Sequence, residues 1–371
     1  MLNRLTRAVQ TTAAPHSDRI NRRGRPLAAL AVAALGTSLL AGCGAGAGAE
    51  TGSEEATGDS AASGELQEIT FLSYLPMETL SMVPEMMAVS GGYFEKHGLD
   101  VEIQEVKGSP QAMQLLLSGA GDITRIDALD TYNAVGAEDM PLRNVGTLTR
   151  NPSIKLLHSS EAPLESPEDF VGKTIGVPSE GGSSSKTVSL MLQNAGIDPS
   201  EVEQQVVGLT PATFQLVQNG TLAGYMVSHD SALIAQTQND DALIYDFSDA
   251  LTAGAQVYVT TPESIEDEPE KLKKYLAAIK EATAAIVADE DLTDTIETLR
   301  SEYDFATLMD DDIARAGLEE QRRQWTNGGE SPLLTTDEAE WQAGYEELVA
   351  AGDVPDGLDS AEWVDNSLLP E

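Results

Sequence analysis

The sequence predicts an α/β protein with two lobes, each containing a mostly parallel sheet flanked by helices. Between residues 66 and 248, short apolar segments typical of strands take turns with segments of helical periodicity. Alternation of this kind favours parallel sheets covered by helices, and the chain is long enough for two such domains. From about residue 262 onward the pattern is almost entirely helical. We expect this last part to pack back on the first lobe.

The first lobe is predicted to contain four strands and three helices. We expect the strands at 66–75, 99–106, 122–126 and 142–150. We expect the helices at 82–92, 109–119 and 127–137. The second of these helices has the clearest boundaries, because Ser109 is a favourable N-cap, Pro110 suits the first helical position and Gly119 is a typical end.

The second lobe repeats this order of elements. We expect its strands at 154–160, 173–179, 203–209, 224–228 and 242–248. We expect its helices at 166–172, 183–195, 211–220 and 231–238. The predicted boundaries are 66–155 for the first part of lobe 1, 156–247 for lobe 2, and 248–371 for the return to lobe 1 with the C-terminal helices.

The N-terminus has the pattern of an export signal. Arginines at 19, 22, 23 and 25 precede a 14-residue apolar stretch at 27–40, which is shorter than the ~20 residues that a spanning helix needs. The segment "LAGC" at 40–43 resembles the bacterial lipobox, and Cys43 is the only cysteine of the chain. We therefore expect a signal peptide at 1–42 and a lipidated, flexible tether at 43–65, which would place the protein at the outer face of the cell membrane. Sec and twin-arginine export both fit the segment "NRRGRPL".

The charge and the histidines exclude several classes of function. The chain has a formal net charge of −39, and its first 42 residues contribute +5, so the remainder carries about −44. Nucleic acid is a poor partner for such a surface. The four histidines have no metal-ligand spacing, so we expect neither a metal nor a cofactor.

The segment "GVPSEGGSSSK" at 176–186 is a candidate ligand-binding loop. It joins a predicted strand to a predicted helix, where free N–H groups and the helix dipole favour an acceptor or an anion. Glycine permits close approach to the backbone, and serine adds hydroxyl donors. A plain N-cap is the alternative interpretation. In open α/β sheets, ligands bind beyond the carboxyl ends of strands, and several predicted strand ends here carry Ser or Thr.

Four segments together resemble a known family. They are "GGYFEKHGLDVEI" at 91–103, "LLSGAGDIT" at 116–124, "EDFVGKTIGV" at 168–177 and "LVQNGTLAGYMVS" at 216–228. This ordered set is similar to the substrate-binding proteins of ABC importers for thiamine precursors, sulfonates and nitrate. The resemblance implies a type II periplasmic-binding-protein-like fold, with two lobes that close on a small molecule. The chain departs from the family at Ala223 and Gly224, where members often have an acidic residue.

We therefore expect a lipid-anchored substrate-binding component that captures a sulfonate-like or thiamine-pyrimidine-like nutrient and delivers it to a permease and its ATPase. We expect a monomer that is not an enzyme. An enzyme of the same fold acting on a pyrimidine-type substrate is one alternative, but its known branch uses a cysteine-rich motif that is missing here. A surface-binding lipoprotein without a transport role is the other.

The candidate ligand residues come from both lobes. In lobe 1, Tyr74 favours stacking on a heteroaromatic ring, whereas Arg125 favours an oxyanion; a salt bridge from Arg125 to an acid such as Asp127 is its alternative role. In lobe 2, His229 and Asp230 follow a strand end, where a cap or polar lining explains them as well as a general base does. The full predicted set is Ser73, Tyr74, Ser109, Arg125, Ser179, Gly181, Gly182, Ser183, Ser184, His229 and Asp230.

Overall fold

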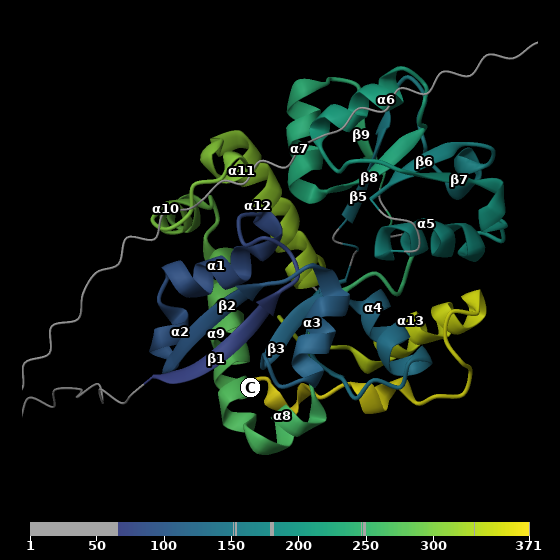
Figure 1. Ribbon diagram of the computed structural model, residues 1–371. Coiled ribbons are helices and arrows are strands. Elements are labelled where there is room, and N and C mark those ends of the chain that lie inside the picture. The colour runs from purple at the N-terminus through teal and green to yellow at the C-terminus, as the bar shows by residue number, and fades with distance from the viewer. Residues whose placement is uncertain are drawn as a thin grey trace, which may run out of the picture. The chain divides into compact units, whose positions relative to one another are not determined.

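A computed structural model describes residues 66–150, 152, 154–178, 182–245, 247, 250–329 and 331–370 (Figure 1). The described residues belong to one compact unit that begins at Ala62. The predicted signal peptide, Cys43 and the tether lie outside the described residues, as do Ser179 and Gly181. Among the described residues, we find no helix with the length and apolar character needed to cross a bilayer.

The first sheet has five strands in the order β2-β1-β3-β10-β4. Their bounds are β1 Gln67–Ser73, β2 Leu99–Glu105, β3 Ile123–Asp127, β4 Arg143–Thr149 and β10 Gln256–Thr260. All are parallel in direction except β10, which runs antiparallel to both β3 and β4. The segments between β1 and β4 form the helices α1 Val83–Ser90, α2 Tyr93–Lys96, α3 Gly108–Leu117 and α4 Ala128–Tyr132. We call this sheet with its helices lobe 1.

Strand β10 is the element that the sequence pattern missed. All five of its residues are buried, so apolar and polar side chains do not alternate along it. It comes from the part of the chain after lobe 2 and inserts between β3 and β4, which only long-range pairing could specify.

The second sheet has the order β7-β6-β8-β5-β9. Its strands are β5 Ile154–Ser159, β6 Thr174–Val177, β7 Glu203–Val206, β8 Gly224–Ser228 and β9 Ala242–Tyr245. Only β5 runs against the others. The helices are α5 Ser183–Asn194, α6 Phe214–Gln218 and α7 His229–Gln238, with a short 3-10 helix at Pro167–Phe170. We call this sheet with its helices lobe 2.

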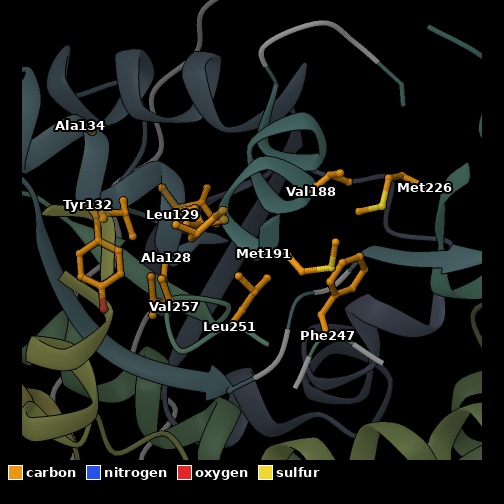
Figure 2. Packing of buried hydrophobic residues seen from close by; sticks show 14 of the residues in the cluster. Ala128, Leu129, Tyr132, Ala134, Val188, Met191, Met226, Phe247, Leu251 and Val257 are labelled. Carbon is orange, nitrogen blue, oxygen red and sulfur yellow. The ribbon is translucent and has the colours of Figure 1, made fainter. Parts of the chain in front are cut away.

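The chain crosses between the two sheets twice, between β4 and β5 and again between β9 and β10. A continuous apolar cluster lies along this connection (Figure 2). It joins Leu129 of α4 and Val257 of β10 to Met191 of α5 and Met226 of β8. The lobes therefore share part of their core beside the crossing segments.

The C-terminal part is helical, as expected. It contains α8 Pro262–Asp267, α9 Pro269–Ala288, α10 Thr293–Arg300, α11 Ala306–Met309, α12 Asp311–Thr326 and α13 Glu338–Ala351. Helix α9 packs on α1 and α2 of lobe 1, but α12 also contacts α7 and α13 contacts α5 (Figure 1). The helices of this C-terminal part thus contact elements of both lobes.

Candidate functional site

A large cavity among the described residues lies where strand ends of both sheets face each other. Its volume is about 810 Å³, within the usual range for small-molecule sites. Lobe 1 contributes the chain after β1, the start of α3 and the segment from Asp127 to Met140. Lobe 2 contributes the first turns of α5 and α7. These are strand ends or helix starts, as the rule for open α/β sheets predicts.

Tyr74 and Ser109 of the predicted set line this cavity from lobe 1. The Tyr74 hydroxyl accepts a hydrogen bond from the side-chain amide of Gln256 in β10, which fixes the position of the ring. Ser73 does not line the cavity. It is completely buried and its hydroxyl donates to the Leu75 carbonyl at 2.6 Å, so its predicted role as a ligand contact is wrong.

Arg125 is also not a ligand contact in this structure. Its side chain is fully buried, and its guanidinium forms an ion pair with Glu85, with Nε 2.8 Å from Oε1. Another nitrogen of the guanidinium donates to the Ser81 carbonyl at 2.6 Å. Burial alone would lower the pKa of Arg125, but Glu85 raises it above its ordinary value. Residue 125 lies inside β3 rather than at its end, so its side chain points under α1, and the salt-bridge alternative applies with Glu85 in place of Asp127.

The start of α5 tests whether its serines act as an N-cap or are available to a ligand. Gly182 is the N-cap and provides no side-chain cap, and Ser183 and Ser184 occupy the first turn. Both serines line the cavity with Gly182. Among the described residues, neither hydroxyl is used as a cap or bonded to another side chain. The plain N-cap interpretation therefore does not apply to Ser183 and Ser184, since Gly182 is the N-cap.

Charged residues around the cavity are mostly acidic. Five carboxylates line it, from Glu78, Asp127, Asp130, Glu138 and Asp230, against one ammonium group from Lys186. Glu78 and Glu138 are exposed at the rim. Met113, Met140, Leu75 and Leu209 add apolar surface. Within the described part of the chain, no group of three or more potential ligand side chains is arranged to hold a metal ion.

Two charged residues of this lining, Asp130 and Lys186, were missed by the sequence reasoning. Burial raises the pKa of the Asp130 carboxyl, whereas the facing Ser109 hydroxyl and the charge of Lys186 lower it. Asp130 lies three residues after Asp127, and Lys186 lies two residues after the predicted ligand residue Ser184. The available signal was a charged residue in the first turns of a helix that follows a strand end.

Asp230 lines the cavity but its oxygens are already occupied by groups outside lobe 2. They accept hydrogen bonds from the Thr79 hydroxyl at 2.6 Å, the Leu80 amide at 2.9 Å and the Thr307 hydroxyl at 3.0 Å. Thr79 and Leu80 follow β1, and Thr307 lies in α11. Asp230 therefore ties the start of α7 to lobe 1 and to the return segment.

His229 lies beside Asp230 and is only 2% exposed. Both ring nitrogens are buried without a hydrogen bond of normal geometry among the described residues, and Nε2 faces the Gly317 backbone of α12. Burial, with the charge of Lys155, lowers the pKa of His229 to about 4 despite the opposing effects of Asp230 and Glu320. The imidazole is neutral at pH 7. His229 also lines the cavity, but both ring nitrogens are buried and Nε2 faces α12, so the polar-lining interpretation fits it better than that of a general base.

Sequence comparisons agree with this geometry. The profile of the family described as NMT1/THI5 like matches residues 80–291. The riboflavin-binding protein RibY of Chloroflexus aurantiacus is 24% identical over 312 residues, covering 82% of this chain and 87% of RibY. The yeast 4-amino-5-hydroxymethyl-2-methylpyrimidine phosphate synthase THI11 of Saccharomyces cerevisiae is 25% identical over 263 residues, covering 67% of this chain and 74% of THI11.

The fold is similar to that of a solved binding protein. The periplasmic aliphatic sulphonate binding protein SsuA from Escherichia coli superposes with a TM-score of 0.62 at 18% identity, covering 81% of this chain and 98% of SsuA. The two five-stranded sheets with their crossing segments thus form the two-lobe fold of periplasmic binding proteins.

Proposed function

Because the chain belongs to the NMT1/THI5-like family, we propose that it is the substrate-binding component of an ABC importer, which captures a small organic nutrient between its lobes. The observation that carries this proposal is the cavity of about 810 Å³ lined by strand ends of both sheets. A site built this way releases its ligand when the lobes separate. The partners are then a permease and its ATPase, and the binding component works as a monomer without a cofactor.

The place of action follows from the N-terminal pattern. Lipid on Cys43 holds the domain at the outer face of the membrane, and residues 43–65 give it reach toward the permease. The lobe boundaries that fit this function are 66–155 with 248–371 for lobe 1, and 156–247 for lobe 2.

Of the two ligand classes, the pyrimidine-like class fits the cavity better than the sulfonate-like class. A sulfonate needs compensating cations or many converging N–H groups, and the lining offers Lys186 and the start of α5 against five carboxylates. The guanidinium of Arg125 is taken by Glu85. A nitrogen heterocycle can donate N–H groups to carboxylates and can pack on Tyr74 and the methionines.

An enzyme of this fold is the second candidate, because THI11 bears the name of a synthase. The chain has one cysteine, in the predicted lipobox, and His229, which lines the cavity, has buried ring nitrogens. These features favour binding without turnover.

A thermal-shift screen against a library of sulfonates, nitrogen heterocycles and other small nutrients tests this function. A ligand at 100-fold over its Kd stabilises the folded state by roughly 2.7 kcal/mol, which raises Tm by several degrees. We expect at least one such compound, recovered chemically unchanged after incubation. A library without any stabilising compound, or a compound that is converted, counts against the proposal.

A further inference from the structure

The cavity has charged groups of opposite sign on opposite walls. Asp130, from α4 of lobe 1, and Lys186, from α5 of lobe 2, both line it. Their charges influence each other, since Lys186 lowers the pKa of Asp130. Within the described part of the chain, the two groups do not form a direct ion pair.

The Lys186 ammonium is the feature that calls for a ligand. Its side chain makes no hydrogen bond or ion pair with any described residue, although the chain carries 61 acidic residues against 22 basic ones. Lys186 is partly buried, so its ammonium group has lost some of its water without gaining a partner among the described residues. Beside it are the Ser183 and Ser184 hydroxyls, so the start of α5 offers an ammonium group and two hydroxyls that can donate to an acceptor.

The lobe 1 wall has the opposite character. Its charged lining residues are Glu78, Asp127, Asp130 and Glu138, all carboxylates. Of these, Asp130 is the deeper group that faces Ser109 and Lys186, and the two glutamates lie at the rim. A carboxylate in this position attracts a cationic or N–H-rich nitrogen group and repels an anion.

We infer that the cavity takes a dipolar ligand, with a donor-rich nitrogen group against Asp130 and an anionic or acceptor oxygen against Lys186 and the first turn of α5. This inference rests on the proposed function and specifies the ligand of the same site. A ligand of this kind binds both lobes at once and replaces the missing ion pair between them. A simple anion satisfies only the lobe 2 wall, and a simple amine satisfies only the lobe 1 wall.

Calorimetry with three probes tests the inference. The probes are 4-amino-5-hydroxymethyl-2-methylpyrimidine, its phosphate monoester, and ethanesulfonate as an anion without a nitrogen donor. We expect the phosphate ester to bind the parent protein about tenfold or more tightly than the alcohol, because it adds a charge-assisted contact to Lys186. Ethanesulfonate should not bind at millimolar concentration.

Two nearly isosteric variants assign the ends of the ligand. Lys186→Gln should remove most of the preference for the phosphate ester and leave the alcohol unaffected. Asp130→Asn should weaken both pyrimidines about tenfold or more, because a neutral amide replaces the carboxylate that receives the N–H groups. Ser109→Ala provides a second variant at the same wall if Asp130→Asn fails to fold. The exposed residues Lys173 and Glu102 give matched controls as Lys173→Gln and Glu102→Gln.

The possible failures are distinguishable. If the pyrimidines bind but Asp130→Asn and Lys186→Gln behave as the parent does, the two-ended contact is wrong and the transport function stands. Tighter binding of ethanesulfonate than of either pyrimidine also overturns the inference, as does the absence of binding by all three probes. The proposed function fails only if the wider library screen also yields no ligand.

Discussion

Replacing Arg125 by methionine separates a structural role from a role in ligand binding. The guanidinium lies fully buried against Glu85, whose Oε1 also accepts a hydrogen bond from the Tyr258 hydroxyl at 2.7 Å. Arg125→Met leaves the Glu85 carboxylate without its counter-charge in the core. Breaking a buried pair in this way costs about 3–5 kcal/mol. At roughly 2–4 °C per kcal/mol, Tm should fall by about 6–20 °C.

The assay is thermal unfolding of the parent, Arg125→Met, and the double variant Arg125→Met with Glu85→Gln. The glutamine removes the charge but keeps an acceptor for Tyr258, so the double variant should regain part of the lost stability. Ligand affinity of folded Arg125→Met should fall only moderately, because Arg125 does not line the cavity and contacts its lining through Gln256 and Tyr74 and through the Ser81 carbonyl. A variant with unchanged Tm and abolished binding would refute this reasoning.

The remaining predictions concern the lobe contact and the anchor. The pKa of His229 is lowered to about 4, so the folded state disfavours the protonated imidazole, and up to ~3 kcal/mol of the free energy of unfolding is lost as pH falls from 6.5 to 4. Urea unfolding of His229→Leu should show a weaker dependence of stability on pH over this range. The same pH dependence in the variant and the parent would contradict this prediction. Asp230→Asn weakens charge-assisted bonds worth ~1.5–3 kcal/mol to Thr79 and its neighbours, so small-angle scattering should show a larger radius of gyration, whereas an unchanged profile argues against a lobe contact. Gly317→Ala brings a Cβ against the Leu80 side chain and should destabilise by ~1–3 kcal/mol in denaturant unfolding; a gain in stability, as the higher helix propensity of alanine alone would give, argues against this contact. Cys43→Ser should release the protein from the membrane fraction, and correctly cleaved protein that stays bound would exclude lipid anchoring.

Most of the fold could be predicted from the sequence because the strands are short, end at turn-forming residues and alternate with helices. Nine of the ten strands coincide with predicted segments, and β10 does not. Its residues are buried on both faces, so local periodicity carries no signal for a strand that joins the sheet from a distant part of the chain. The family resemblance implied the two-lobe fold, which the superposition on SsuA confirms.

The candidate site was predictable only where a strand end coincides with the carboxyl edge of its sheet. That reasoning led to Tyr74, Ser109 and the start of α5, which line the cavity and stay predicted ligand contacts. It failed for Arg125, because β3 continues to Asp127 and the alternation of side chains turns Arg125 toward Glu85. No local pattern reveals an ion pair between residues that are 40 positions apart.

The charges that decide the ligand class were also hidden from the sequence. A charged residue in the first turns of a helix is commonly a solvated residue that complements the helix dipole. Asp130 and Lys186 become a candidate pair for binding a ligand only because α4 and α5 line the same cavity.

Equilibrium binding of the stabilising compound, followed by mass spectrometry of the compound recovered afterwards, tests the central claim most directly. The account predicts one ligand molecule per protein and about tenfold or more weaker binding by the double variant Ser183→Ala with Ser184→Ala, whose lost hydroxyls line the cavity. It also predicts that the compound returns chemically unchanged. Undiminished binding by the double variant, or conversion of the compound into a product, would contradict the account.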